Sequence, residues 1–352
     1  IFFLLMVGYS VLIEYYHRAW TRIPSSIQRN VSPKTKVSVI IALRNEEENI
    51  PALMKALRAQ DYPRDLHEII LVNDHSIDDT QEMITAHAEA GYISAIRLPD
   101  APQLATVSFK KMAIRRGIEL SAGELIITTD ADCVFEPGWI SSIVSFYETT
   151  GAQFIAAPVK FQQSSGFLSV FQRLDFMSLQ GITGASVFKK FHCMCNGANL
   201  AYTRAAFDEV NGFDGIDHIP SGDDMMLMYK IFARHPDKVH YFKSAGAIVS
   251  TRAAAGWNEF FQQRIRWASK AVHYDDKNVF RVLLMVYLVN VCFAIAAVAS
   301  FWKINYLMFF LLMVIAKLLV EFPFVNNIAI FFCQIYLCTN FFHLFYFYDF
   351  VF

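Results

Sequence analysis

Two aspartates directly follow an apolar segment in the middle of the chain. In LIITTDADC (125–133), Asp130 and Asp132 are separated by one small residue. Carboxylates this close repel one another and lose hydration on burial unless a cation lies between them. The pair indicates either a turn at the end of a strand, where aspartate is common, or a divalent metal held by oxygen ligands and bridging to a phosphate.

Other polar residues also follow apolar segments in this part of the chain. Short β-branched or apolar segments, which predict buried strands, occur at 37–42, 67–74, 93–98 and 124–130. They alternate with segments of helical spacing, which predicts an α/β domain with a mainly parallel sheet. In such sheets ligands bind beyond the carboxyl ends of the strands. The residues just after the predicted strands are Arg44, Glu46, Asp74, Asp130 and Asp132, and this convergence favours a binding site over a simple turn.

The two ends of the chain are predicted to lie in a membrane. Apolar residues make up 55% of the 352 residues and concentrate at the ends, which is unusual for a soluble enzyme. Residues 1–16 predict an N-terminal transmembrane helix. Arg18, Arg22 and Arg29 follow, and because positive residues stay in the cytoplasm, we expect the domain at 35–270 to be cytosolic. The net charge of −1 gives no reason to expect a nucleic-acid partner.

The C-terminal region, 279–352, predicts three further transmembrane helices. They are expected at 279–302, 306–320 and 328–348, given that a span takes about 20 residues. The chain begins without Met and ends within an apolar segment, which is compatible with a fragment of a longer protein that has more spans. The six cysteines show no pairing pattern, so we expect free thiols.

Five motifs resemble those of the family 2 glycosyltransferases with the GT-A fold. They are ALRNEEENI, VNDHSIDDT, TTDADC, GDD and QRIRW, in the order found in that family. The resemblance covers about residues 35 to 270. It is to the membrane-bound branch, which includes ceramide glucosyltransferases and relatives of cellulose and chitin synthases. It implies a Rossmann-like cytosolic domain that binds a nucleotide-sugar donor.

The resemblance assigns roles to the residues at the predicted strand ends. Asp130 and Asp132 would hold Mg²⁺ or Mn²⁺ against the donor diphosphate, where a cation stabilises the negative charge of the leaving group. Arg44, Glu46 and Asp74 would form the nucleotide pocket, since carboxylates accept hydrogen bonds from ribose hydroxyls or a base N–H. The alternative is that Arg44 and Glu46 cap the following helix. The usual DDGS of the family reads NDHS here, which leaves the base open.

Three more charged residues take roles by the same resemblance. Lys110 falls where the family has a lysine near the donor phosphates, although a solvated helix charge is the alternative. Asp224 matches the catalytic aspartate that takes the proton of the acceptor hydroxyl, and Asp223 matches the acidic residue before it. The alternative for Asp224 is a helix N-cap. Gly197 and Asn199 would shape a loop over the sugar.

The QRIRW motif lies on a predicted amphipathic helix at 257–270. By resemblance this helix lies at the membrane surface, with Gln263, Arg266 and Trp267 beside the donor and acceptor, because arginine suits phosphate. The alternative is a basic and aromatic interface helix without a catalytic role. A second amphipathic helix is expected near 166–180, lying either on the bilayer or in a core.

Together these features predict an inverting glycosyltransferase in a membrane, expected to be a bacterial inner membrane with the catalytic domain facing the cytoplasm. It would move one sugar, or very few, from a nucleoside-diphosphate sugar to a membrane lipid. UDP is the expected nucleoside diphosphate. The alternative is a processive polysaccharide synthase that extends a membrane-bound glycan; four predicted helices favour a lipid groove over a glycan pore. Two other classes are a transporter or receptor with a nucleotide-binding domain and an inactive glycosyltransferase-like scaffold.

Overall fold

The computed structural model describes residues 2–25, 32–88, 93–99, 109–217, 219, 222–270 and 276–337. The chain divides into two compact units. The helical unit consists of Ile1–Ile23, Phe161–His192 and Ala253–Phe352, and the sheet unit consists of Pro24–Lys160 and Cys193–Arg252. None of the described cysteines forms a disulfide bond.

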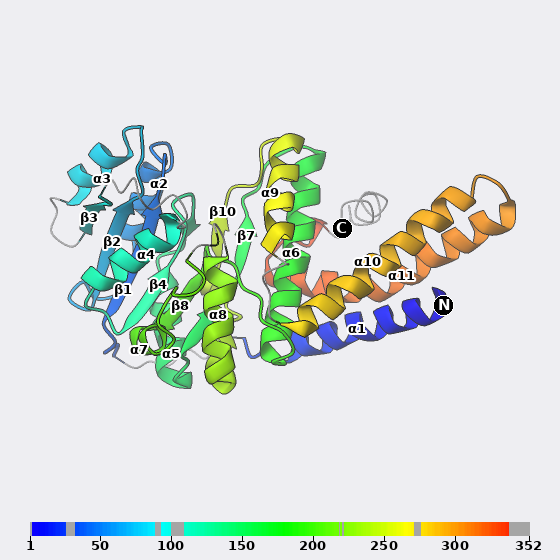
Figure 1. Ribbon diagram of the computed structural model, residues 1–352, viewed down its shortest axis with the longest axis horizontal. Coiled ribbons are helices and arrows are strands. Elements are labelled where there is room, and N and C mark those ends of the chain that lie inside the picture. Colours follow the sequence, from blue (N-terminus) through cyan, green and yellow to red (C-terminus); the bar gives the residue numbers. More distant parts are fainter. Residues whose placement is uncertain are drawn as a thin grey trace. The chain divides into compact units, whose positions relative to one another are not determined.

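The sheet unit is built on seven strands in the order β3-β2-β1-β4-β8-β6-β9 (Figure 1). The strands are β1 (Val37–Leu43), β2 (His67–Asn73), β3 (Ile93–Arg97), β4 (Leu125–Thr128), β6 (Phe154–Ala156), β8 (Leu200–Thr203) and β9 (Val239–Tyr241). The first four are mutually parallel, whereas β8 is antiparallel to both β4 and β6. The central strands are almost fully buried, as their continuous apolar sequences require when helices cover both faces.

Helices and a small second sheet surround this core. The helices are α2 (Ile50–Arg58), α3 (Thr80–Ala88), α4 (Phe109–Leu120), α5 (Trp139–Thr150), α7 (Arg204–Glu209) and α8 (Asp223–Arg234), with single turns η1 (Pro236–Lys238) and η2 (Ala245–Ala247). The second sheet has the order β5-β10-β7, formed by β5 (Val134–Phe135), β10 (Val249–Thr251) and β7 (Val159–Phe161). The predicted α/β class with a mainly parallel sheet is confirmed.

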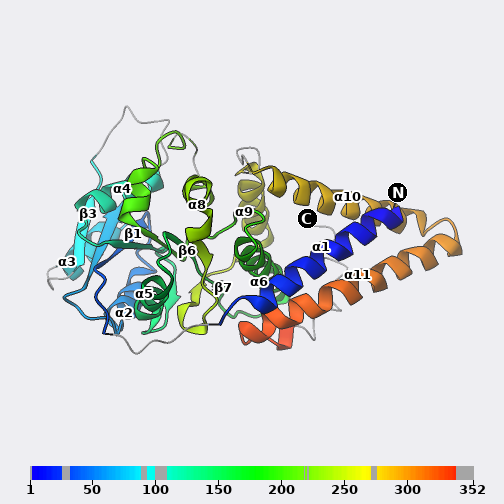
Figure 2. The same ribbon diagram turned by 90° about the horizontal axis from the view of Figure 1, so that it is seen from below.

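The described residues of the helical unit form five helices. They are α1 (Phe2–Arg22), α6 (Phe167–Phe188), α9 (Trp257–Lys270), α10 (Lys277–Ala299) and α11 (Ile304–Phe331). Helix α1 packs against α6, α10 and α11, and Figure 2 shows α1 and α11 running side by side. Among the described helices, α10 and α11 are long and apolar enough to cross a membrane.

The helical unit differs in three places from the expected membrane helices. Helix α1 exists but is not one of the two candidate spans, so its crossing of a membrane stays a prediction. The span expected at 306–320 is part of the longer α11, which continues through Pro323. The span expected at 328–348 begins inside α11, and from residue 338 it lies outside the described residues.

Helix α6 also differs from a helix with one apolar face. Its polar side chains Gln172, Arg173, Asp175 and Gln180 are buried along with its apolar ones. The reason is that α6 has neighbours on several sides, since α1 and α11 pack against it and α9 contacts it through side chains. Within the helical unit α6 is therefore a core helix.

Candidate functional site

The two aspartates at 130 and 132 lie on a turn just beyond the end of β4. Between and after them, Ala131 and Cys133 are buried, while the carboxylates are partly exposed. The turn is closed by the amide of Cys133, which donates to the carbonyl of Asp130 at 3.2 Å. The alternation of small buried and larger partly exposed residues thus directs both carboxylates to one open edge of the sheet.

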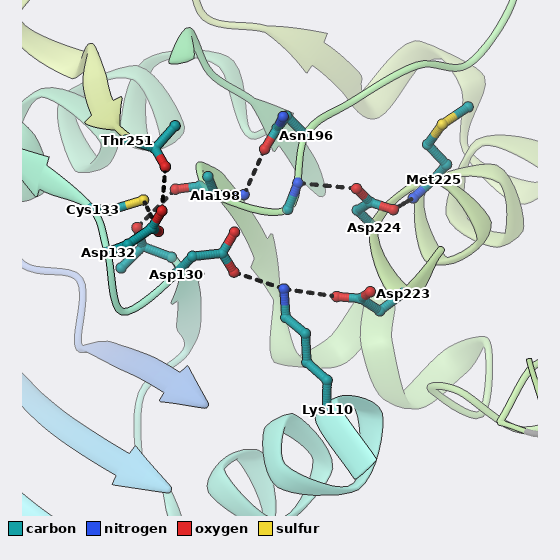
Figure 3. Close-up of polar contacts among 12 residues, drawn as sticks. Lys110, Asp130, Asp132, Cys133, Asn196, Ala198, Asp223, Asp224, Met225 and Thr251 are labelled. Atoms are coloured by element: carbon teal, nitrogen blue, oxygen red, sulfur yellow. Dashed lines mark hydrogen bonds and ion pairs between the residues drawn. The ribbon is translucent and has the colours of Figure 1, made fainter. Parts of the chain in front are cut away.

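Lys110 lies between two of the predicted site carboxylates, as Figure 3 shows. Its Nζ is 2.6 Å from Oδ1 of Asp130 and 3.6 Å from Oδ2 of Asp223. Burial opposes the charge, but Asp130, Asp223 and Asp224 outweigh it and raise the pKa of Lys110 well above its ordinary value. Lys110 is therefore a cation held among carboxylates rather than a solvated helix charge.

The two aspartates at 223 and 224 open helix α8. Gly222 precedes them with φ of 82°, a left-handed conformation that glycine adopts without steric cost. Asp224 accepts two backbone hydrogen bonds, from the amide of Met225 at 2.8 Å and from that of Gly197 at 3.0 Å. The N-cap position itself is Gly222, so Asp224 is not the N-cap that the alternative assumed.

The loop at 196–199 is fixed from below by a buried asparagine. Asn199 is fully buried; its amide donates to the carbonyls of Pro158 and Ala247, and its oxygen accepts from the indole of Trp139. These three bonds use both amide hydrogens and one lone pair of the oxygen, and because the side chain is fully buried, Asn199 supports the loop from within the fold. The loop in turn presents the amide of Gly197 to Asp224.

Two contacts of Asp132 were not predicted from the sequence. Thr251, the last residue of β10, donates its hydroxyl to Oδ2 of Asp132 at 2.6 Å, and the thiol of Cys133 lies 3.6 Å from Oδ1. Thr251 arrives because β10 pairs antiparallel with β5, the strand that follows the aspartates. No motif marks this pairing, and only the position of Thr251 at the end of a short β-branched segment could have suggested it.

Arg44, Glu46 and Asp74 gather at the neighbouring strand ends. Leu43 of β1 is paired with Asn73 of β2, so the residues that follow leave the sheet at the same edge. Oδ2 of Asp74 lies 4.0 Å from Nη1 of Arg44, and the Arg44 guanidinium lies over the ring of Phe109. These contacts give Arg44 a position beside the predicted nucleotide pocket.

Glu46 connects this group to the two aspartates of the turn. Its carboxylate accepts a hydrogen bond from the side chain of Asn49 at 2.6 Å, and its own amide donates to Thr80. Burial raises the pKa of Glu46, the bond from Asn49 lowers it, and the charges of Asp132 and Asp130 raise it further. Since α2 begins at Ile50 without a side-chain cap, neither Arg44 nor Glu46 caps that helix.

The donor set at 130 and 132 suits a hard divalent cation. Both side chains present carboxylate oxygens, the ligands that Mg²⁺ and Mn²⁺ take. Within the part of the chain that the structure describes, however, no group of three His, Cys, Asp or Glu side chains could hold a metal ion. Two carboxylates supply part of a coordination shell of six, so any such ion would need further oxygens from a ligand and from water.

The predicted residues of the QRIRW motif belong to the helical unit. The other predicted site residues belong to the sheet unit. On α9, Gln263 and Trp267 are partly exposed and Arg266 is exposed. The residue that anchors α9 is instead Arg264, which pairs with the buried Asp175 of α6 and contacts the rings of Phe260 and Trp267.

The Asp175–Arg264 pair was missed from the sequence. Burial raises the pKa of Asp175 to about 7, although the charge of Arg264 and its hydrogen bond lower it. Asp175 is the one acidic residue of α6, and this was the signal that could have indicated the pair, because a buried carboxylate needs a partner.

Two family models match the chain. The model described as Glycosyl transferase family 2 matches residues 38–210, and the one described as Glycosyl transferase family group 2 matches residues 125–347. Together they cover the strand-end residues, the start of α8 and both long apolar helices.

Curated relatives match over part of their length. Glycosyltransferase AglE of Haloferax volcanii is 28% identical over 189 residues, which are 54% of this chain and 59% of that protein. Undecaprenyl-phosphate 4-deoxy-4-formamido-L-arabinose transferase of Serratia proteamaculans is 34% identical over 161 residues, 45% of this chain and 47% of the relative. The chain thus spans about half the length of the curated relatives it matches.

A solved structure confirms the fold. The mannosyltransferase PcManGT from Pyrobaculum calidifontis, in complex with GDP-Man and Mn²⁺, superposes with a TM-score of 0.64 at 17% identity, covering 95% of this chain and 94% of that one. The expected GT-A fold is therefore confirmed.

Proposed function

The chain belongs to the family 2 glycosyltransferases, and we propose that it moves one sugar from a nucleoside diphosphate to a membrane lipid with the aid of a divalent metal. The observation that carries this proposal is the convergence at one edge of the sheet. Asp130 and Asp132 follow β4, Lys110 opens α4, and Asp223 and Asp224 open α8, with Lys110 in direct contact with Asp130 and Asp223.

The donor is proposed to bind across the ends of β1, β2 and β4. Asp74 and Glu46 offer carboxylates to the nucleoside, and Arg44 offers a planar cation. We take UDP as the first candidate. GDP is the second, because the solved relative with the same fold is a complex with GDP-Man and Mn²⁺.

Asp130 and Asp132 are the proposed metal ligands. A bound Mg²⁺ or Mn²⁺ would neutralise charge that develops on the departing diphosphate. The hydroxyl of Thr251 orients Asp132 by its bond to Oδ2, and the weakly donating thiol of Cys133 lies 3.6 Å from Oδ1. Gln263, Arg266 and Trp267 of α9 keep their proposed role toward donor and acceptor on the resemblance of their motif alone.

Asp224 is the proposed base for a hydroxyl acceptor. The carboxylate takes the proton of the acceptor hydroxyl as its oxygen bonds to the anomeric carbon. The bond from that carbon to the diphosphate oxygen breaks on the opposite face, and its electron pair leaves with the diphosphate. The amides of Met225 and Gly197 hold the carboxylate in place. Asp223 is proposed to keep Lys110 within reach.

The acceptor is proposed to be a lipid held by the helical unit. Helices α10 and α11 could cross a membrane, and their exposed apolar side chains suit acyl or prenyl chains. The Serratia relative is named for undecaprenyl phosphate, which makes a polyprenyl phosphate a specific candidate besides a lipid with a free hydroxyl. The proposed location is a bacterial inner membrane with the sheet unit in the cytoplasm. Arg18 and Arg22 near the end of α1 support this orientation, because positive residues stay on the cytoplasmic side.

Purified protein tests the enzyme and its donor together. We would incubate it with Mn²⁺, a bacterial lipid extract and a panel of UDP- and GDP-sugars, and measure release of the nucleoside diphosphate. Turnover of one donor that depends on the lipid supports the proposal. Binding of donors without turnover of any would contradict it and favour an inactive scaffold.

A further inference from the structure

The ion pair between Lys110 and Asp130 uses one of the two carboxylate oxygens that Asp130 would offer to the proposed metal. Nζ of Lys110 lies 2.6 Å from Oδ1 of Asp130, and about a third of each side chain is exposed. A bond from a carboxylate oxygen to a small divalent cation such as Mg²⁺ is shorter than this, at about 2.0 to 2.1 Å. An ammonium group and a divalent cation cannot both take that position on one oxygen.

The surroundings explain why a lysine is held there. Asp130, Asp223 and Asp224 all stabilise the charge on Lys110, so the ammonium neutralises part of a group of carboxylates that would otherwise repel one another. A divalent ion that arrived beside Lys110 would add like-charge repulsion of about the size of the attraction it gained from one carboxylate. The lysine therefore competes with the metal for the same negative charge.

A second partner for Lys110 is already in place. Oδ2 of Asp223 lies 3.6 Å from Nζ, and Figure 3 shows the ammonium between the two aspartates. Four single bonds in the lysine side chain allow the ammonium to move by an ångström or so without a change in the backbone. Asp223 is therefore available to keep the charge after Asp130 gives it up.

We propose that Lys110 is an exchangeable placeholder, which pairs with Asp130 when no donor is bound and moves to Asp223 when metal and diphosphate arrive together. This rests on the proposed function, since it needs a metal at Asp130 and Asp132. The diphosphate brings the negative charge that offsets two neighbouring cations. Metal alone should accordingly bind weakly, and metal with a nucleoside diphosphate should bind tightly.

Binding of Mn²⁺ measures this exchange without any turnover. We would titrate Mn²⁺ into the purified full chain at pH 7.5, follow free Mn²⁺ by electron paramagnetic resonance, and compare wild type with Lys110→Gln and Lys110→Arg. Without nucleotide, Lys110→Gln should lower the Kd of Mn²⁺ by on the order of 10-fold, because it removes a cation beside the metal. Lys110→Arg keeps the charge and should stay near wild type. With UDP or GDP present, the difference between wild type and Lys110→Gln should narrow.

Two control variants show whether a change in Mn²⁺ affinity comes from the site at Asp130 and Asp132. Arg116→Gln removes a cation from the same helix α4, but Arg116 pairs with Glu119 on the surface, so its Mn²⁺ affinity should equal that of wild type. Asp132→Ala should bind no Mn²⁺ at this site. Equal or weaker Mn²⁺ affinity in Lys110→Gln, with binding still lost in Asp132→Ala, overturns the exchange and leaves the proposed function standing. Absence of Mn²⁺ binding in wild type even with both nucleotides contradicts the proposed metal site and the exchange with it.

Discussion

Two ion pairs, one in each unit, are built from similar groups and differ in exposure. In the sheet unit, the side chains of Lys110 and Asp130 are 38% and 36% exposed. In the helical unit, those of Arg264 and Asp175 are 11% and 0% exposed. A pair open to water can exchange a partner at small cost, whereas breaking a buried pair leaves a charge without water or partner.

The neighbours of each pair extend the difference. A second carboxylate, that of Asp223, lies 3.6 Å from Nζ of Lys110, so the ammonium can change its partner and still be paired. Arg264 lies instead against the rings of Phe260 and Trp267, which hold it in one position. The open pair thus suits a site where ligands arrive, and the closed pair suits a permanent attachment of α9 to α6.

The largest effect on activity is expected from a change in the strand-end site of the sheet unit. Asp132→Ala removes one of the two proposed metal ligands, so transfer should be lost entirely, and Mn²⁺ should restore activity to EDTA-treated wild type but not to the variant. Sugar transfer from labelled donor is the measurement, with the exposed Glu119→Ala on α4 as a matched acidic control that keeps activity. Full activity of wild type in EDTA would mean that the two aspartates hold no metal.

The next effect concerns the base. Asp224→Asn keeps the size of the side chain but removes its proton affinity, so turnover with a hydroxyl acceptor should fall by roughly 10²-fold or more, while donor affinity survives. Steady-state transfer and donor binding measured on the same preparation separate the two. Near wild-type turnover sinks the base assignment, and would fit an acceptor such as a lipid phosphate, whose oxygen is already ionised.

The closed pair should matter for stability instead. Asp175→Ala leaves Arg264 buried without its partner, and loss of one member of a buried pair destabilises by about 3–5 kcal/mol, so the melting temperature should fall clearly. Lys110→Gln, in the open pair, should shift it far less, since exposed pairs contribute about 0–1 kcal/mol. Thermal unfolding in detergent checks both. Equal shifts for the two variants would remove the distinction between the pairs.

The smallest effect is a pH dependence of that stability. The pKa of Asp175 is about 7 in the folded protein and 3.8 for an ordinary aspartate, so the folded state holds the proton more strongly. The free energy of unfolding that Asp175 contributes is therefore fully present below about pH 4 and is lost as the pH rises through about 7. Asp175→Asn cannot titrate, and its melting temperature should vary less than that of wild type between pH 5 and 8; an unchanged slope contradicts the assignment.

The sequence predicts the open site better than the closed one for a physical reason. Carboxyl ends of parallel strands meet at one edge, so Asp74, Asp130 and Glu46 could be placed together from strand order alone. Thr251 and Asp175 could not, because their partners lie 119 and 89 residues away and are brought near by packing that no local pattern marks. The same limit applies to α6. Its polar residues are buried by neighbouring helices, and the sequence pattern alone does not indicate this burial.

The length of α11 shows a further limit of predicting helix ends from the hydrophobic pattern of the sequence. The predicted span ended at residue 320, and Glu321 and Pro323 follow it in the sequence. In the structure the helix continues, since Glu321 is buried beside Lys317 and accepts a hydrogen bond from Tyr9 of α1. A partner on another helix satisfies the charge, and Pro323 gives up only one backbone donor.

The central claim is that the strand-end carboxylates serve metal-dependent transfer of a sugar to a lipid. The most direct measurement supplies labelled UDP- or GDP-sugar and Mn²⁺ to native membranes that contain the wild type or Asp132→Ala, followed by extraction with organic solvent. Label is expected in the organic phase for wild type alone, and mild acid then separates an acid-labile glycosyl phosphate from a stable glycoside. Label found only in a high-mass, water-insoluble polymer would contradict the account and favour a polysaccharide synthase.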